Sequence, residues 1–394
     1  ADTRPGMNTL RRMAIGVAAA LAALVALPLH AQVEPVMLRI GHAAPTSGWL
    51  ARVGIENENA ARLAVQELNR RGLQLYGQPV AFELISVDDA GEPTRARAAA
   101  QALVAAGVVA VVGHLLSASS MAAAPVYAAA GIPQVSPSAS ISAFTHSGWP
   151  TAFRMLADDA RMATVLAHHA VGTLQLRRVA VVDDRSDWGR SIADAFAQAL
   201  QGAGAQVVGR RQLQASSAAA RLALVRELQA LAPDALFFGG FDREAGPLLR
   251  QMRRQGLDAR FIVGDGACTP DLVSYWAVGE AADDQVLCPL PAGVQGLDTP
   301  AMAGFVAAYQ AQFGNLVPEF YGAYAYDAVM ALADALLRAG SAAPEELLRA
   351  LAQTRGYPGV TGTIGFDERG DRVAPAVSLF TYRDEQRVLL RTLR

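Results

Sequence analysis

The chain of 394 residues contains no lysine, and all 34 of its basic residues are arginine. This absence excludes several classes of enzyme. A Walker-A loop places a lysine on the phosphates of a nucleotide, and protein kinases also need a lysine there. Schiff-base aldolases and pyridoxal-phosphate enzymes need a reactive lysine amine. An arginine-only, alanine-rich composition is typical of a GC-rich genome.

Charge is also sparse. Only 18% of residues are charged and the net charge is −2, whereas 52% are hydrophobic. This balance argues against a disordered chain, and it provides no electrostatic reason to expect a nucleic-acid partner. At about 100–200 residues per domain, the length suits two or three domains.

Catalytic motifs are absent as well, because the chain has no G-x-S-x-G, H-E-x-x-H or G-x-G-x-x-G. His168 and His169 are adjacent on a predicted helix and cannot share a ligand face. The acidic pairs 88–89 and 183–184 fall at strand ends, where turn and capping roles are favoured over acid–base catalysis. We therefore expect no enzyme activity, no cofactor and no bound metal.

The N-terminal region has the pattern of a signal peptide. Arg11 and Arg12 precede an apolar run over 13–27, and residues 29–31 form a small-residue cleavage site. A membrane anchor is the alternative, but the run is shorter than about 18–20 residues and ends at Pro28. Residues 1–6 are interpreted as translated upstream of Met7. We expect residues 1–31 to be upstream residues and signal peptide, and the mature protein to be periplasmic.

Two cysteines, Cys268 and Cys288, are present. An even count in an oxidising compartment favours a disulfide bond between them. Two buried free thiols are the alternative. A metal site is poorly supported, because no further cysteine or histidine lies beside them at ligand spacing.

Strand and helix patterns alternate along the mature chain, which predicts parallel sheets covered by helices. A first set has strands at 36–41, 80–87, 108–113 and 132–136, with helices at 55–71, 94–106 and 117–130. A second set has strands at 178–182, 205–211, 235–238 and 261–264, with helices at 161–172, 188–203, 218–231 and 243–255. Further helices at 302–313, 321–339 and 344–354 and strands at 362–366 and 377–382 follow a predicted linker around 289–293. The fold class is therefore α/β with two Rossmann-like lobes.

Ligands of open parallel sheets bind beyond the carboxyl ends of the strands, so the loops that follow strands are the candidate site. Ser117 opens a helix after a buried strand, and a helix N-terminus can hold a carboxylate. A simple N-cap is the alternative for Ser117. Ser138 and Ser140 lie in the next such loop, which suits an ammonium and a carboxylate or is a plain serine-rich turn.

The second set of strands adds a carboxylate and aromatic rings. Asp265 lies between two glycines, which allow the backbone to approach a ligand closely. Its side chain could pair with an ammonium group, or it could be a turn aspartate. Trp188, Phe241 and, more weakly, Trp49 could cover an apolar ligand side chain, with core packing as the alternative.

These motifs together resemble the periplasmic leucine/isoleucine/valine-binding proteins, the type I substrate-binding proteins of ABC importers. The resemblance covers about residues 36–382. It depends on Gly54 leading into a helix that ends V-Q-E-L-N, and on the segments 87–90, 112–115, 136–137, 154, 187–189, 239–240, 264–266, 326–328 and 366–371.

The resemblance implies a type I periplasmic binding protein fold with a three-crossing hinge. Lobe one would comprise 36–157 plus 290–374, and lobe two 158–289 plus 375–394. A ligand that contacts both lobes would shift an open–closed equilibrium toward the closed form.

The resemblance also implies residue roles for the amino-acid headgroup. Ser117 would bind the carboxylate, and the backbone carbonyl of Ser138 would bind the ammonium. Ser140, where the family often has threonine, would contact the α-substituents. Asp265, where amino-acid binders typically have glutamate, would face the ammonium.

The ligand side chain would contact Trp188, Phe241, Leu115 and Trp49. Phe241 lacks the hydroxyl of the tyrosine usual at this position. The tyrosine of the first loop is replaced by Val53, and Trp49 lies close by in the sequence.

The function implied is capture of an aliphatic, branched-chain-type amino acid and its delivery to an inner-membrane ABC permease by a monomer. An aromatic acid, an amide or urea is the alternative ligand, but such relatives lose the acidic ammonium partner. A ligand sensor is a further alternative, although no membrane segment or output domain follows residue 32. An exported hydrolase would need a nucleophile–base pair, which the sequence does not indicate.

Overall fold

The computed structural model describes residues 34–275 and 284–394. The predicted signal peptide lies outside the described residues. Within them, no helix combines the length and the apolar character that crossing a bilayer requires. Residues 36–394 form one compact unit, and the following description concerns that unit.

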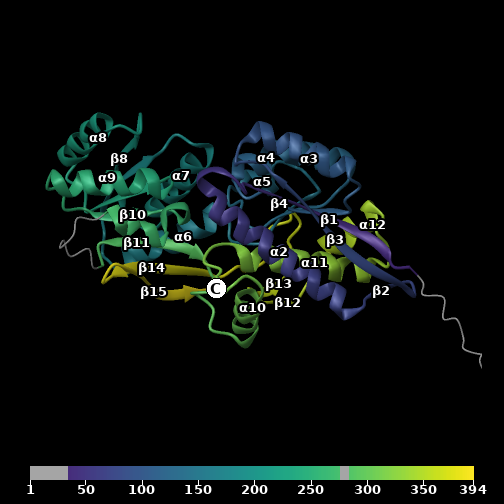
Figure 1. The fold of residues 1–394 in the computed structure, drawn as a ribbon. Coiled ribbons are helices and arrows are strands. Elements are labelled where there is room, and N and C mark those ends of the chain that lie inside the picture. Colours follow the sequence, from purple (N-terminus) through teal and green to yellow (C-terminus); the bar gives the residue numbers. More distant parts are fainter. Residues whose placement is uncertain (1–33, 276–283) are drawn as a thin grey trace, which may run out of the picture. The chain divides into compact units, whose positions relative to one another are not determined.

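A six-stranded sheet forms the centre of the first lobe (Figure 1), in the order β2-β3-β1-β4-β5-β6. All neighbours are parallel except the β2–β3 hairpin. Its strands are β1 (Val36–Ala44), β2 (Gln74–Leu75), β3 (Gln78–Asp88), β4 (Ala110–Gly113), β5 (Gln134–Ser136) and β6 (Ala152–Arg154). The 3-10 turn η1 (Gly48–Leu50) and the helices α2 (Ala51–Arg71), α3 (Pro93–Ala105), α4 (Ser117–Ala130) and α5 (Ala143–His146) follow these strands.

Strand β4 explains why helices cover both faces of this sheet. Val111 packs with residues of α3 and α4, whereas Ala110 and Val112 pack with residues of α2 and α11 (Gly322–Ala339). Successive side chains of a strand point to opposite faces. Both faces are therefore buried, which is why β4 has an unbroken apolar sequence.

A seven-stranded sheet forms the second lobe, in the order β15-β14-β11-β10-β9-β7-β8. Val179 and Val181 pack in a different core cluster from Ala180 and Val182, so this sheet is also covered on both faces. Its strands are β7 (Arg178–Asp183), β8 (Gln206–Gln212), β9 (Ala235–Gly239), β10 (Arg260–Val263), β11 (Val286–Pro291), β14 (Val377–Arg383) and β15 (Gln386–Leu393). The helices are α6 (Asp159–Gly172), α7 (Asp187–Gly202), α8 (Ala218–Ala230) and α9 (Asp242–Arg254), and the 3-10 turns are η2 (Asp265–Ala267) and η3 (Pro270–Tyr275).

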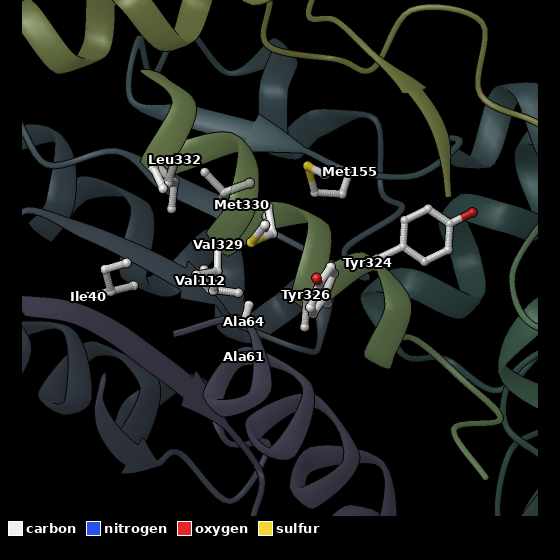
Figure 2. Packing of buried hydrophobic residues seen from close by; sticks show 14 of the residues in the cluster. Ile40, Ala61, Ala64, Val112, Met155, Tyr324, Tyr326, Val329, Met330 and Leu332 are labelled. Carbon is white, nitrogen blue, oxygen red and sulfur yellow. The ribbon is translucent and has the colours of Figure 1, made fainter. Parts of the chain in front are cut away.

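Between β11 and β14 the chain returns to the first lobe. Helix α11 is buried along nearly its whole length, and Figure 2 shows its Val329 and Met330 among Val112 of β4 and Ala61 and Ala64 of α2. The chain thus passes between the lobes three times: after β6, after β11 and before β14. The other elements of this segment are α10 (Pro300–Gln312), α12 (Pro344–Ala352), β12 (Tyr357–Gly359) and β13 (Gly362–Ile364).

The structure confirms the α/β fold in two lobes and corrects several details. The sheets are mixed rather than wholly parallel, because β14 pairs antiparallel with both β11 and β15. The predicted linker around 289–293 is wrong, since Pro289 and Pro291 belong to β11. The pairing of β11 with β10 ends at Leu287, so both prolines lie where β11 has one neighbour and one free edge.

Helix α2 begins at Ala51, four residues before the predicted start. Gly54 concealed this, because glycine disfavours a helix interior. Here it permits a close approach, since a Cβ at this position would lie 2.0 Å from the carbonyl oxygen of Pro45. The proposed residue limits of the two lobes stay a prediction.

Candidate functional site

The loops that follow β1, β4, β5, β7, β9 and β10 meet around a cavity of about 210 Å³. All eight residues predicted for ligand binding line it: Trp49, Leu115, Ser117, Ser138, Ser140, Trp188, Phe241 and Asp265. Segments from both lobes therefore contribute to one site. Its location follows from the rule that the carboxyl ends of parallel strands form the ligand crevice.

Ser117 is the first residue of α4 and is buried. Leu116 holds the N-cap position and no side chain caps this helix, so a capping role for Ser117 is wrong. The Ser117 hydroxyl instead accepts a long hydrogen bond, 3.4 Å, from the backbone N–H of Ile141. The first N–H groups of a helix lack partners within it, and they carry partial positive charge. This end of the cavity suits a carboxylate.

The Ser136–Ser140 loop is held in place by its own hydroxyls. Ser136 Oγ donates to the carbonyl of His114 at 2.8 Å, and Ser138 Oγ donates to the carbonyl of Leu115 at 2.7 Å. Ser140 Oγ accepts from the indole Nε1 of Trp188 at 2.9 Å. These bonds fix the loop, and the last of them joins the first lobe to the second.

Asp265 presents a carboxylate with one satisfied and one free oxygen. Oδ2 accepts a hydrogen bond of 2.9 Å from the hydroxyl of Tyr321. Oδ1 is buried and has no hydrogen-bond partner among the described residues. A turn role alone does not explain this arrangement, because it leaves a buried carboxylate oxygen without a hydrogen-bond partner.

The surroundings of Asp265 oppose its negative charge. Burial raises the pKa of its carboxyl from 3.8 to about 7, and the nearby carboxylate of Asp159 acts in the same direction. The hydroxyl of Tyr321 and the neighbouring N–H groups of Asp265 and Gly266 act in the opposite direction. A cation placed against Oδ1 would therefore stabilise the ionised form of this buried carboxyl.

Aromatic rings form the apolar wall of the cavity. Phe241 lies between the two tryptophans, with ring centroids 5.1 Å from Trp49 and 5.0 Å from Trp188. Trp188 also belongs to the core cluster of the second lobe, so its packing and cavity-lining roles coexist. Trp49 is half-exposed, and the guanidinium of Arg243 lies 4.3 Å from its ring centre.

The cavity is also lined by residues that were not predicted as ligand contacts: Leu50, Arg52, Val53, Leu116, Ala118, Ser186, Asp187, Asp242, Gly266, Thr269, Asp271, Phe320 and Tyr321. Of these, Leu116, Asp187, Asp242 and Gly266 belong to strand-end motifs that the sequence already indicated. Tyr321 is the most informative of the others. It precedes α11, whereas the rule for parallel sheets points only to loops that follow strands. The aromatic pair Phe320–Tyr321 directly before a strongly apolar helix was the available signal.

His114 lies near this loop cluster but is occupied elsewhere. Its Nδ1 lies 2.6 Å from Asp89 Oδ2, and its Nε2 lies 3.1 Å from the hydroxyl of Tyr127. The ring is fully buried among these groups and is not among the residues that line the cavity.

One group of potential metal ligands occurs among the described residues, comprising His146, Asp158 and Asp371. Arg154 Nε donates to Asp371 at 2.8 Å, and Ser142 Oγ donates to Asp158 at 2.6 Å. The guanidinium thus already supplies positive charge to Asp371, so the group is explained as an ion-pair network. It lies apart from the residues that line the cavity.

The two cysteines are joined, as predicted. Cys268 at the end of η2 and Cys288 in β11 form a disulfide bond with their Cα atoms 5.5 Å apart. Cys268 is three residues beyond Asp265, so the bond ties the Asp265 loop to the second sheet.

Comparison with known proteins shows the family to which this chain belongs. Residues 37–386 match the family model described as periplasmic binding protein. An amino acid binding protein of Pseudomonas aeruginosa is 33% identical over 356 residues, which cover 90% of this chain and 92% of that protein.

Two solved structures extend the similarity. The leucine-binding protein LivK of Thermotoga maritima has a TM-score of 0.80 and 26% identity, with 91% of this chain and 99% of that chain covered. The branched-chain amino acid binding protein LivJ of Streptococcus pneumoniae, solved with isoleucine, has a TM-score of 0.78 and 25% identity, with the same coverage. With its fold, its cavity between two sheets and the match along nearly its whole length, the chain belongs to the periplasmic binding protein family.

Proposed function

We propose that this protein captures an aliphatic amino acid of the branched-chain type in the periplasm and delivers it to an ABC permease of the inner membrane. The observation that carries the proposal is the free, buried Oδ1 of Asp265 in a cavity with aromatic walls. A buried carboxylate without a partner is costly, and an α-ammonium group is the partner that would remove this cost.

The negatively charged α-carboxylate of an amino acid would bind at the opposite end of the cavity. Ser117 and the N-terminal N–H groups of α4 would accept the α-carboxylate. The Ser138 carbonyl would accept a hydrogen bond from the ammonium, and Ser140 would contact the α-substituents. The cavity would then bind a zwitterion between two ends of opposite polarity.

The remaining wall favours an apolar side chain. Trp49, Trp188, Phe241 and Leu115 all line the cavity, and burying a branched aliphatic chain against them would contribute about 1.5–3 kcal/mol. The isoleucine in the Streptococcus pneumoniae structure supports this ligand class.

Ligand capture would act by closing the lobes, with the predicted limits 36–157 plus 290–374 and 158–289 plus 375–394. Contacts that already join segments of the two lobes around the cavity include those of Trp188 with Ser140, Tyr321 with Asp265, and Trp49 with Phe241. A ligand that bridges the same groups would bind the closed form better and shift the population toward it.

Members of this family serve transport as substrate-binding proteins rather than as enzymes. For this chain we propose the same non-enzymatic role, performed by a periplasmic monomer after cleavage of its signal peptide. The permease is the partner that the proposal requires.

Titration calorimetry with leucine and with its 2-oxo analogue tests the ligand class. Asp265→Asn should weaken leucine binding by about 2–5 kcal/mol, the range for removing one partner of a buried charge pair. It should leave binding of the 2-oxo analogue unchanged or improve it, because that ligand has no ammonium.

Asp242→Asn is a matched control. Asp242 lines the same cavity, but its two oxygens accept hydrogen bonds from the Arg243 N–H and the Thr269 hydroxyl. This substitution should change leucine binding much less. If the unmodified protein prefers the 2-oxo analogue, or if the Asp265→Asn variant binds leucine normally, the amino-acid proposal is wrong and an aromatic acid or amide becomes the better candidate.

A further inference from the structure

Glu56 of α2 is a buried carboxylate with an unusual set of partners. Its Oε2 accepts the backbone N–H of Glu319 at 2.9 Å, and its Oε1 accepts those of Phe320 at 3.0 Å and Gly322 at 2.9 Å. No ion pair with a basic side chain involves Glu56 in the described part of the chain. The carboxylate therefore interacts with main chain alone, more than 260 positions away in sequence.

The N–H of Gly322 belongs to the first residue of α11, and those of Glu319 and Phe320 belong to the segment that leads into this helix. No side chain of that segment caps the helix, so its first donors need an acceptor from elsewhere. A carboxylate at this end is also favoured by the helix dipole. Glu56 thus acts as the cap of α11, supplied by a different helix.

This cap fixes the backbone on both sides of Tyr321. The side chain of Tyr321 reaches the second lobe and donates to Oδ2 of Asp265. A series of hydrogen bonds thus connects Glu56 with the backbone of residues 319–322, and the hydroxyl of Tyr321 with the carboxylate of Asp265. Asp265 is the carboxylate on which the proposed function depends. The fit is tight, because a Cβ at Gly322 would lie 3.0 Å from Oε1 of Glu56.

We propose that Glu56 is a positioning residue for the ligand site: by capping α11 it holds Tyr321 on Asp265, and it thereby tunes that carboxylate for a cationic ligand group. This inference takes its ligand from the proposed function. The contacts from Glu56 through Tyr321 to Asp265 do not depend on the identity of that ligand. The hydrogen bond from Tyr321 favours the ionised form of Asp265. Its loss would raise the pKa of Asp265, so that a higher pH would be needed to bind an ammonium group.

Other charged groups face the same space. Asp159 of α6 acts on Asp265 directly. The cavity also contains Arg52 of α2, Asp187 of α7, Asp242 of α9 and Asp271 of η3. They are the same in all the variants below, so a shift between variants reports the change at residues 56 and 321.

The test measures leucine affinity between pH 5 and 9 by calorimetry. Glu56→Gln should lower affinity about tenfold at pH 7 and move the midpoint of the pH profile upward. Glu67→Gln is the control: Glu67 lies on the same helix and accepts from Tyr326, away from the cavity, so this variant should keep the original profile.

Combination with Tyr321→Phe distinguishes positioning from general weakening. If Glu56 acts through Tyr321, adding Glu56→Gln to Tyr321→Phe should cause no further loss and no further shift. Independent, multiplicative losses would overturn the proposal, and so would an unchanged pH profile in Glu56→Gln. Should Glu56→Gln fail to fold, Gly322→Ala displaces the same carboxylate without removing its charge and should give the same shift.

A readout without ligand separates this inference from the proposed function. Carbon-13 NMR of the aspartate carboxyls in the ligand-free protein should show that Asp265 titrates at higher pH in Glu56→Gln than in the unmodified protein. If leucine fails to bind but this titration moves, the proposed ligand is wrong and the positioning role stands. If leucine binds and the titration does not move, the positioning role is wrong.

Discussion

Asp265 and Asp327 are both buried aspartates, but their surroundings differ. Asp327, in α11, accepts from the N–H of Val360 at 2.9 Å, from the N–H of Thr361 at 2.8 Å and from the Thr361 hydroxyl. Asp265 has a single side-chain partner and a free Oδ1. Burial raises the pKa of both carboxyls; at Asp327 the Thr361 hydroxyl and the N–H groups of Thr361 and Val360 act in the opposite direction, whereas at Asp265 the Tyr321 hydroxyl is the main opposing group.

The difference separates a structural carboxylate from one that is available for a ligand. The chain itself satisfies Asp327, and Arg372 extends that network by donating to the Thr361 hydroxyl at 2.8 Å. Asp265 lies in a cavity and lacks a partner at one oxygen. Most buried polar atoms in proteins have partners, so an oxygen that lacks one and also lies in a cavity is a candidate for contact with a ligand.

The largest effect is expected when Asp327, the structural aspartate of the two, is replaced. Asp327→Ala should lower the free energy of unfolding by about 3–5 kcal/mol, because three donors lose their buried acceptor and the buried guanidinium of Arg372 loses a nearby negative charge. Urea denaturation measures this loss. The folded fraction should retain leucine affinity, and a variant as stable as the parent would contradict the structural role.

The second prediction is that replacing Asp265 stabilises the ligand-free protein at high pH, the opposite of the effect expected at Asp327. Its folded pKa is raised to about 7 from an unfolded value of 3.8. Its stabilising effect is thus complete below pH 4 and is lost as pH rises through 7. At about 1.4 kcal/mol per pKa unit, the ligand-free protein should lose on the order of 2–4 kcal/mol from this group over that window. Asp265→Asn should lack the loss and be the more stable protein at pH 8. Equal pH–stability curves for the two proteins would disprove it.

The third prediction concerns the covalent bond beside Asp265. Replacing Cys268 and Cys288 by alanine should cost about 3 kcal/mol of stability, the value for a loop of this length in the chain-entropy model. Thermal unfolding with and without reductant checks it. Only the unmodified protein should respond to reductant, and an unaffected melting temperature would show that the bond adds no stability.

The smallest effect is expected at the carboxylate end of the cavity. Ser117→Ala should weaken leucine binding by about 1–3 kcal/mol, the cost of removing a hydrogen bond to a charged acceptor. Because Ser117 does not cap α4, the stability of the ligand-free protein should hardly change. Calorimetry at constant pH measures the affinity. Unchanged affinity would remove Ser117 from the proposed site.

The sequence by itself predicted much of this protein from local patterns. Period-two and period-3.6 spacing located most strands of the two sheets and their long helices, because burial of one face imposes that spacing. It missed the short elements β2, β6 and α5, as well as β11 and β15 at the antiparallel side of the second sheet. Strand-end loops then identified Asp265 and the serine loop, since parallel strands bring their carboxyl ends together. Local breaks also misled, as at Gly54 and at Pro289 and Pro291, where tertiary packing overrides propensity.

Tertiary structure alone decided which of these groups are satisfied. No local sequence pattern around Asp327 predicts that Val360 and Thr361 are its donors, and none around Asp265 predicts its contact with Tyr321. The contacts of Glu56 with residues 319, 320 and 322 likewise depend on how α2 packs against α11. Residue type and spacing determine which elements form. Whether a buried oxygen has a partner depends on chain segments that only folding brings together, and that is what distinguishes a structural carboxylate from one that is available for a ligand.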